Sequence, residues 1–268
     1  MEQAEPPIAA QGSGMPAVNK VGLNDLLEVV GLGMRDFRRA PGYGLFFGGI
    51  YVVGGWTLVL FLVQFRLYYL VYPMAVGFAL IAPFIASGFY TVSQRLESAP
   101  QDAAGRLLTW GRVLGSVRSM FSRDLGWMAL VTGFSFFIWM DIAAFLSFGF
   151  MGFQLFHFNE LIHEILTTPT GWLFLVVGNT AGAIIAFTVF SYTVVSIPML
   201  FERDIDFITA MVTSVRFVLQ NRAVMALWCA TIAAVTFVSL LSAFIGLFVT
   251  LPVLGHATWH LYRRAVAQ

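Results

Sequence analysis

The sequence predicts an all-α membrane protein whose six transmembrane helices form three hairpins, with amphipathic interfacial helices on the cytoplasmic side. Three observations predict this class. Of the 268 residues, 59% are hydrophobic and 11% are charged, and the mean hydropathy is +0.81, whereas a soluble domain is about half apolar and a quarter charged. Apolar runs long enough to cross a bilayer core of about 30 Å recur along the chain. The basic residues gather between these runs.

The chain begins with a segment that we expect to be a disordered tail, residues 1–22. Its opening letters, MEQAEPPIAAQGSGMPA, are acidic and rich in Pro and Gly, and they lack the basic start and apolar core of a cleavable signal. Residues 23–268 are expected to form a single transmembrane domain. The one cysteine, Cys229, excludes an internal disulfide and a thiolate-bound cluster.

The expected spans follow from the lengths of the apolar runs. Four runs each reach the length of about 20 residues that a span needs. A fifth region, residues 223–262, is twice as long, so we expect a turn near LSAFIG, residues 241–246. The six expected spans cover residues 43–65, 67–92, 125–153, 171–195, 223–242 and 244–262.

Charge placement supports the count of six independently. With the N-terminus inside, 14 of the 15 basic residues fall in cytoplasmic segments, and only Arg66 lies outside. This bias is what the positive-inside rule predicts. A five-helix arrangement would place Arg263 and Arg264 outside, so six spans with both termini in the cytoplasm are favoured.

The hairpins suggest a weak threefold repeat. Each is preceded by an amphipathic segment whose arginines are expected to contact anionic lipid headgroups. Each even-numbered span carries a proline, Pro83, Pro198 or Pro252. Proline removes a backbone donor and kinks a helix. The kinks suggest either a hinge or pore-lining break, or static packing, and we favour static packing.

Asp141, in FSFFIWMDIAAFL, is the only acid inside an expected span. It lies roughly 13 Å from the outer end of that span at 1.5 Å per residue, and Asn179 lies at a similar depth on the next span. A charged group at such depth is a functional-site hypothesis by default. Asp141 is expected to hold helices together through Asn179, Ser135 or Ser147; the alternatives are a proton or cation site, or a position in the headgroups.

The stretch FQLFHFNELIHEIL, residues 153–166, is expected outside, between spans three and four. His157, Glu160, His163 and Glu164 fall on one narrow face of a helix lying on the outer leaflet. The E-x-x-H spacing occurs twice in di-iron bundles, with two further glutamates, but only once here. A weak metal site is therefore disfavoured against a face that binds a partner or titrates near about pH 6–7.

The loop ERDID, residues 202–206, mixes charges among basic segments. Asp204 or Asp206 is expected to cap the amphipathic helix that follows, favoured by the helix dipole. The alternative is a site formed by Glu202, Arg203 and Asp204 at a domain interface.

Two histidines, His256 and His260, lie four residues apart at the inner end of span six. The spacing places both rings on one helix face and could supply two metal ligands. No third ligand is evident nearby, so we favour an interfacial belt formed with Trp259 and Tyr262.

Two stretches resemble signature segments of a known family: VSIPMLFERDIDFITAMVTSVRFVLQN, residues 195–221, and LPVLGHATWHLYR, residues 251–263. The family is an uncharacterised bacterial one of predicted six-helix integral membrane proteins, classed as a domain of unknown function. The resemblance extends from about residue 25 onward and implies a bacterial inner-membrane protein, without established catalytic residues.

Some members of that family carry the label cytochrome c oxidase subunit I. A haem–copper oxidase core needs about a dozen spans and several histidines at membrane depth. Here the four histidines lie at the membrane edges, in two groups on opposite sides. We therefore reject a catalytic oxidase subunit, while an accessory subunit beside an oxidase stays open.

Three functions remain. A non-enzymatic scaffold or accessory subunit of a larger membrane complex is favoured, because no catalytic constellation is present. A small transporter or channel using Asp141 and the kinked helices is the alternative. An intramembrane enzyme is disfavoured, because the sequence has no evident Ser/His or paired-Asp arrangement, no H-E-x-x-H, and no Walker or dinucleotide motif. We expect no cofactor and no nucleic-acid partner; the expected partners are anionic lipid and other membrane subunits.

Overall fold

The computed structural model describes residues 15–64, 84–98, 108–119, 123–152 and 158–267. Apart from one bridge between Val18 and Val266, the regular structure in these ranges is α-helical, which confirms the predicted class. The helices are α1 (Leu23–Arg39), α2 (Pro41–Val63), a helix over residues 84–98, α5 (Trp110–Ser119), α6 (Arg123–Met151), α7 (Phe158–Thr167), α8 (Pro169–Thr193), α9 (Ser196–Glu202), α10 (Phe207–Gln220), α11 (Arg222–Leu241) and α12 (Leu247–Ala265).

Within the described residues, four helical stretches are long and apolar enough to cross a membrane. They are Pro41–Phe61, Asp124–Met151, Pro169–Glu202 and Arg222–Leu241, and they coincide with four of the six expected spans. Most of the second expected span, residues 67–83, lies outside the described residues, together with Pro83. The sixth forms α12, which is not among the four. The count of six and the threefold repeat therefore stay predictions.

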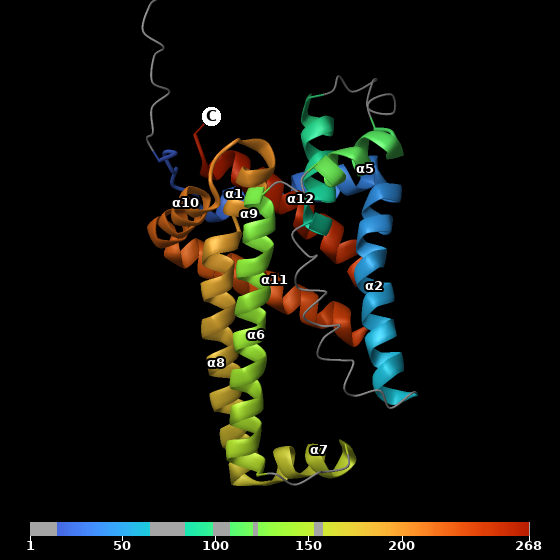
Figure 1. The fold of residues 1–268 in the computed structure, drawn as a ribbon, viewed down its shortest axis with the longest axis vertical. Coiled ribbons are helices and arrows are strands. Elements are labelled where there is room, and N and C mark those ends of the chain that lie inside the picture. The colour runs from blue at the N-terminus through green and yellow to red at the C-terminus, as the bar shows by residue number, and fades with distance from the viewer. Residues whose placement is uncertain (1–14, 65–83, 99–107, 120–122, 153–157, 268) are drawn as a thin grey trace, which may run out of the picture.

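The long helices extend from a densely packed end of the molecule (Figure 1). Helices α6 and α8 run side by side along the long axis, α11 crosses obliquely, and α7 lies at the far end. We call the packed end the head; it comprises α1, α9, α10, α12 and the helix over residues 84–98. Most of the buried core lies there, including Val29, Phe89, Met199, Phe217 and Trp259.

The tightest packing in the head is between α1 and α12. A Cβ atom on Gly33 of α1 would lie 2.5 Å from the carbonyl oxygen of Val253 and 3.1 Å from the Cβ of Ala257. Leu26 and Val29 are buried on the same side of α1. The apolar face of this amphipathic helix, which was expected to face lipid, therefore packs on protein, because small residues on α12 let the two backbones approach.

Residues 15–22, the end of the expected disordered tail, have defined partners. The amide of Asn19 donates to the carbonyl of Ala265 at 2.9 Å, and the amide of Val21 donates to Asn221 Oδ1 at 2.9 Å. Val21 is buried. This part of the tail prediction is wrong, because a short extended segment can pair its backbone with the end of α12 even though its composition is typical of disorder.

Of the three prolines expected to kink spans, the two that lie in described residues, Pro198 and Pro252, act differently. A proline clashes with the carbonyl four residues before it, and α8 does end at Thr193 before α9 begins at Ser196, two residues ahead of Pro198. At this break the amide of Val195 donates a hydrogen bond to Ser214 Oγ of α10, at 3.2 Å. Pro252, by contrast, lies within a continuous α12.

Candidate functional site

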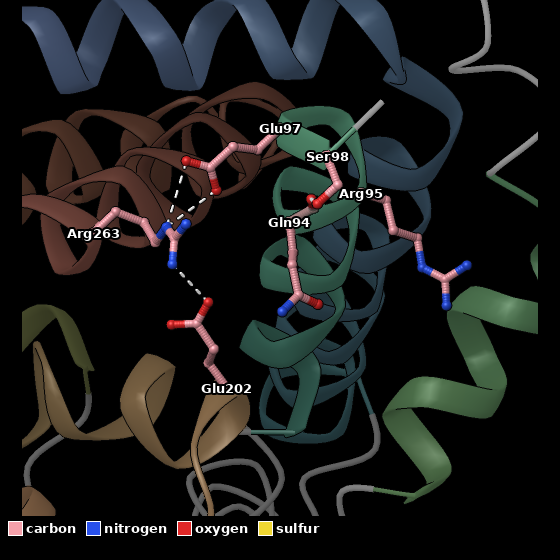
Figure 2. A pocket seen from close by; sticks show the side chains of 6 residues that line it. All are labelled: Gln94, Arg95, Glu97, Ser98, Glu202 and Arg263. Carbon is pink, nitrogen blue, oxygen red and sulfur yellow. Dashed lines mark hydrogen bonds and ion pairs between the residues drawn. The ribbon is translucent and has the colours of Figure 1, made fainter. Parts of the chain in front are cut away.

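The main polar site lies where three helix ends meet in the head. The helix over residues 84–98, α9 and α12 enclose a cavity of about 260 Å³ (Figure 2). Its lining side chains are mostly charged or polar: Gln94, Arg95, Glu97, Ser98, Glu202 and Arg263. Figure 2 shows Arg95 pointing away from Arg263, on the other side of its helix.

Arg263 is the centre of this site. Its Nη1 lies 2.8 Å from Glu202 Oε1, and its Nε lies 3.2 Å from Glu97 Oε2. The guanidinium also lies over the ring of Trp259, 5.8 Å from the centroid. Both glutamates stand at the C-terminal ends of their helices, where the helix dipole is negative. An arginine with several donors is suited to hold two such carboxylates together.

A second layer of hydrogen bonds completes the cluster. The hydroxyl of Tyr262 donates to Glu202 Oε2 at 2.6 Å and accepts from Arg203 Nε at 3.2 Å. The indole of Trp259 donates to Glu97 Oε2 at 3.3 Å. Each carboxylate is thus engaged by side chains of the same protein. The geometry clamps three helices together.

Beneath this cavity lies a buried polar network that joins α1, α12 and the helix over residues 84–98. Asp36 Oδ2 lies 2.7 Å from His260 Nε2, and Ser93 Oγ lies 2.8 Å from His256 Nδ1. Asp36, Ser93 and His256 are fully buried, and His260 nearly so. Arg35, partly exposed, approaches the other oxygen of Asp36 at 3.1 Å.

Two opposed effects set the pKa of Asp36. Burial acts to raise it, because a buried carboxylate loses its hydration, but hydrogen bonds from His260 and Ser93 and the nearby imidazoles lower it by more. The net pKa lies below its ordinary value. Asp36 is therefore a carboxylate at neutral pH, and the network is held by charge-assisted hydrogen bonds.

No local pattern indicates the Ser93–His256 pair, so the predicted absence of a Ser/His arrangement is wrong. The pair nevertheless has no opening to a substrate, because both side chains are fully buried. The metal interpretation of His256 and His260 also finds no support: within the described ranges, no group of three or more His, Cys, Asp or Glu is placed to hold a metal ion.

The structure relocates the expected interfacial belt. His256, Trp259, His260 and Tyr262 are all buried inside the head, so they pack on protein and do not form a lipid-facing belt. Helical spacing indicated a shared face correctly, but it could not distinguish a protein surface from a lipid surface. Two of the four, Trp259 and Tyr262, instead contact the cluster around Arg263.

The loop at residues 202–206 is divided between two roles. Glu202 and Arg203 join the cluster, whereas Asp206 caps α10, its Oδ1 accepting from the amide of Thr209 at 2.9 Å. Hydrogen bonds from Thr209 lower the pKa of Asp206. Asp204 is exposed. Each interpretation of this loop is therefore correct for some of its residues. Asp206 is the helix cap, and Glu202 and Arg203 form part of an interface site that does not include Asp204.

Asp141 and Asn179 are not brought together. Asn179 Nδ2 donates to the carbonyl of Leu175 in its own helix at 2.7 Å, and Asp141 is exposed on α6. Ser135, another expected partner of Asp141, accepts a hydrogen bond from the hydroxyl of Tyr192 at 2.6 Å. The acid therefore faces outward from the packed pair of helices.

The outer polar face is only partly described. Helix α7 exists, at the end of the molecule opposite the head (Figure 1). His163 on it is exposed, and its Nδ1 lies 3.4 Å from Thr167 Oγ1; Glu164 is half-buried. His157 and the side chain of Glu160 lie outside the described residues, so the predicted face stays a prediction.

Sequence reasoning missed Asp36, Ser93, Glu97 and Arg263 as site residues. Asp36 is flanked by arginines, which is typical of a solvated face. Its partner His260 lies 224 positions away, and a single sequence gives no sign of that pairing. The available signal was indirect: two histidines on one helix face, if buried, require acceptors from another element.

Long apolar helices extend from a densely packed head that contains the polar clusters. This arrangement is that of a multi-pass α-helical integral membrane protein. Comparison with known families agrees. Residues 71–202 match the model of a family described as "Predicted integral membrane protein (DUF2189)", a family whose function is unknown. The resemblance expected from the sequence is confirmed, although residues 251–263 lie outside the match and the oxidase label is not supported. No curated protein and no solved structure gave a match.

Proposed function

We propose that this chain is a non-enzymatic accessory or scaffold subunit of a larger membrane complex. One observation carries the proposal: the exposed face of α6 has the pattern of a helix-packing seam with a single acid at its middle. The seam comprises Phe134, Phe137, Ile138, Asp141, Phe145 and Phe148, all exposed. At about 100° per residue, these six positions fall within an arc of roughly 100°.

Lipid alone is a poor environment for this seam. Asp141 lies ten residues before Met151, the last residue of α6, and so about 15 Å from the helix end, near the middle of a hydrocarbon core of about 30 Å. A charged carboxylate there costs about 2.5–3.5 kcal/mol. A partner helix that presents a hydrogen-bond donor or a cation at the same depth would remove that cost.

The coverage of the spans supports the same proposal. In the apolar windows of the α6 and α8 spans, 11% and 0% of the residues are buried. Large side chains such as Phe145, 76% exposed, would supply much of a helix–helix contact. The clamped carboxylates around Arg263 favour a structural role for the head over catalysis.

In the proposed arrangement α1, α9, α10 and the C-terminal end of α12 lie on the cytoplasmic side of a bacterial inner membrane, with six spans and both termini inside. The charge distribution of the sequence supports this orientation. Arg38, Arg39 and Arg222 are exposed at the head, where they can contact anionic headgroups. Exposed Ile208 and Leu219 on α10 would enter the interface beside them.

Co-purification of the tagged full-length chain from native membranes in mild detergent tests the proposal. We expect a stoichiometric membrane partner that Asp141→Asn and Phe145→Ala each release, with recovery falling about tenfold for a loss of roughly 1.4 kcal/mol. The control is Val176→Ala, at an exposed position of α8 outside the seam. Recovery of a partner-free monomer from wild type, or equal partner recovery with all three variants, would contradict the proposal.

A transporter that uses Asp141 is the second candidate. It needs the acid to face a path through the bundle, and Asp141 faces outward from the described part of α6. Proteoliposome flux abolished by Asp141→Asn would support transport, whereas equal flux in both forms would exclude Asp141 from it.

A further inference from the structure

A groove runs between α6, α8 and α11, away from the seam. It has a volume of about 600 Å³. Its lining residues come from three helices: Thr132, Ser135, Phe136 and Trp139 of α6, Gly182, Ile185, Ala186, Val189, Phe190 and Thr193 of α8, and Cys229, Ile232 and Ala233 of α11. All three helices belong to stretches able to cross a membrane, so the groove lies along apolar, membrane-spanning segments. We propose that it binds one acyl chain of a phospholipid from the head-side leaflet.

The chemistry of the lining suits a hydrocarbon chain. Three hydroxyls face the groove, and each donates to a carbonyl of its own helix: Thr132 to Met128 at 2.9 Å, Ser135 to Val131 at 2.8 Å, and Thr193 to Val189 at 2.7 Å. Their protons are therefore committed. The other lining side chains are apolar apart from the thiol of Cys229 and the indole N–H of Trp139. A polar ligand would lose its hydration here and gain few hydrogen-bond donors in return.

The length of the groove matches one leaflet. Its wall on α8 extends over eleven residue steps, from Gly182 to Thr193, or about 16 Å, and half of a hydrocarbon core is about 15 Å. One end reaches Thr193, where α8 joins the head. At the other end the Trp139 ring stands beside Gly182, so close that a Cβ there would lie 3.1 Å from it. A chain entering from the head side would end at Trp139, near the bilayer centre.

The groove and the seam lie on different faces of α6. On α6, the groove positions 132, 135, 136 and 139 centre about 160° from the seam at about 100° per residue. The two faces of α6 are thus opposite, and this inference does not depend on the proposed partner.

Photocrosslinking of the full-length protein tests the lipid site. The protein is reconstituted in vesicles of phosphatidylethanolamine and phosphatidylglycerol with a trace of phospholipid bearing a diazirine midway along one acyl chain. We expect crosslinks to concentrate on the groove positions of residues 132–139, 182–193 and 229–233. Ala186→Phe fills the groove and should lower them about tenfold. Ile184→Phe, at an exposed position on the opposite side of α8 at the same depth, should leave them unchanged.

Cys229 gives an independent measurement, because it is the only cysteine in the chain and lines the groove. Its labelling by a small methanethiosulfonate should be slow with bound lipid, faster after delipidation, and slow again when the vesicle lipids are restored. This test needs no groove variant, so it decides the matter even where Ala186→Phe fails to fold. Crosslinks spread evenly over all exposed helix faces, labelling insensitive to lipid, or a co-purified protein crosslinked in the groove would overturn the proposal.

Discussion

Removing the carboxylate of Asp36 tests whether the buried network holds the head together. Asp36→Ala leaves His260 Nε2, with its side chain only 6% exposed, and the Ser93 hydroxyl without their shared acceptor. Breaking a buried pair in this way costs about 3–5 kcal/mol. Asp36→Asn keeps the shape and one acceptor, so it should lose only the charge-assisted part of the hydrogen bonds, about 1–2 kcal/mol.

The assay is unfolding of the purified full-length chain in mild detergent, followed by tryptophan fluorescence. The matched control is Asp25→Asn, also on α1, whose ion pair with Arg264 at 2.6 Å is 38% exposed on the acid side and should contribute at most about 1 kcal/mol. A cycle that combines Asp36→Ala with His260→Leu should show a coupling of about 1–3 kcal/mol. If Asp36→Ala costs no more than Asp25→Asn and the cycle shows no coupling, the reasoning is refuted.

The Asp36 carboxylate also makes the free energy of unfolding depend on pH at acid pH. Because the folded pKa of Asp36 is below its ordinary value of 3.8, its contribution is fully present above that value. It is lost as the pH falls through the lower folded pKa, since the folded state must then accept a proton. The difference in stability between wild type and Asp36→Asn should therefore stay constant at neutral pH and shrink below about pH 4. A constant difference down to acid unfolding would contradict this.

The other predictions concern the packing of the head and one turn, and all are read as shifts in the thermal midpoint of the purified chain. Arg263→Met should destabilise by about 1–3 kcal/mol, because Glu97 and Glu202 lose their shared partner and Trp259 loses its cation; Glu97→Gln in the same background should recover part of the loss. Gly33→Ala should destabilise by about 1–3 kcal/mol through overpacking against α12, whereas Gly31→Ala, which meets nothing within 4 Å, should be neutral or stabilising. Ala243→Gly should stabilise by up to about 1 kcal/mol, because Ala243 has φ 53° in a region that costs residues with a side chain about 1–2 kcal/mol.

Local patterns predicted the long helices well. A span is specified by length and hydropathy, which any window of sequence contains, so α2, α6, α8 and α11 coincide with expected spans. The cap at Asp206 is equally local. The same reasoning placed the belt of α12 against lipid although its residues are buried in protein, because a helix with apolar and small residues on most sides looks the same in sequence whether protein or lipid surrounds it. Only the packing of α1 across Gly33 and Ala257 distinguishes the two.

The polar site could not be predicted as a set. Glu202, Tyr262 and His260 drew attention individually, but their partners Glu97, Arg263 and Asp36 did not. Glu202 and Arg263 are 61 positions apart in the sequence, and Asp36 and His260 are 224 positions apart. Composition carries no information on contacts between such distant positions. Buried polar side chains need partners, yet burial itself becomes known only when the helices are placed.

The two proposals for the membrane part can be tested independently because they use opposite faces of one helix. The seam around Asp141 is rich in exposed phenylalanine and carries one acid, whereas the groove is mostly apolar and has its hydroxyl protons committed. Asp141→Asn should therefore release a protein partner and leave the lipid crosslinks in the groove intact. Ala186→Phe should do the reverse. If one variant abolished both readouts, α6 would be responding as a whole, and neither face could be assigned its own ligand.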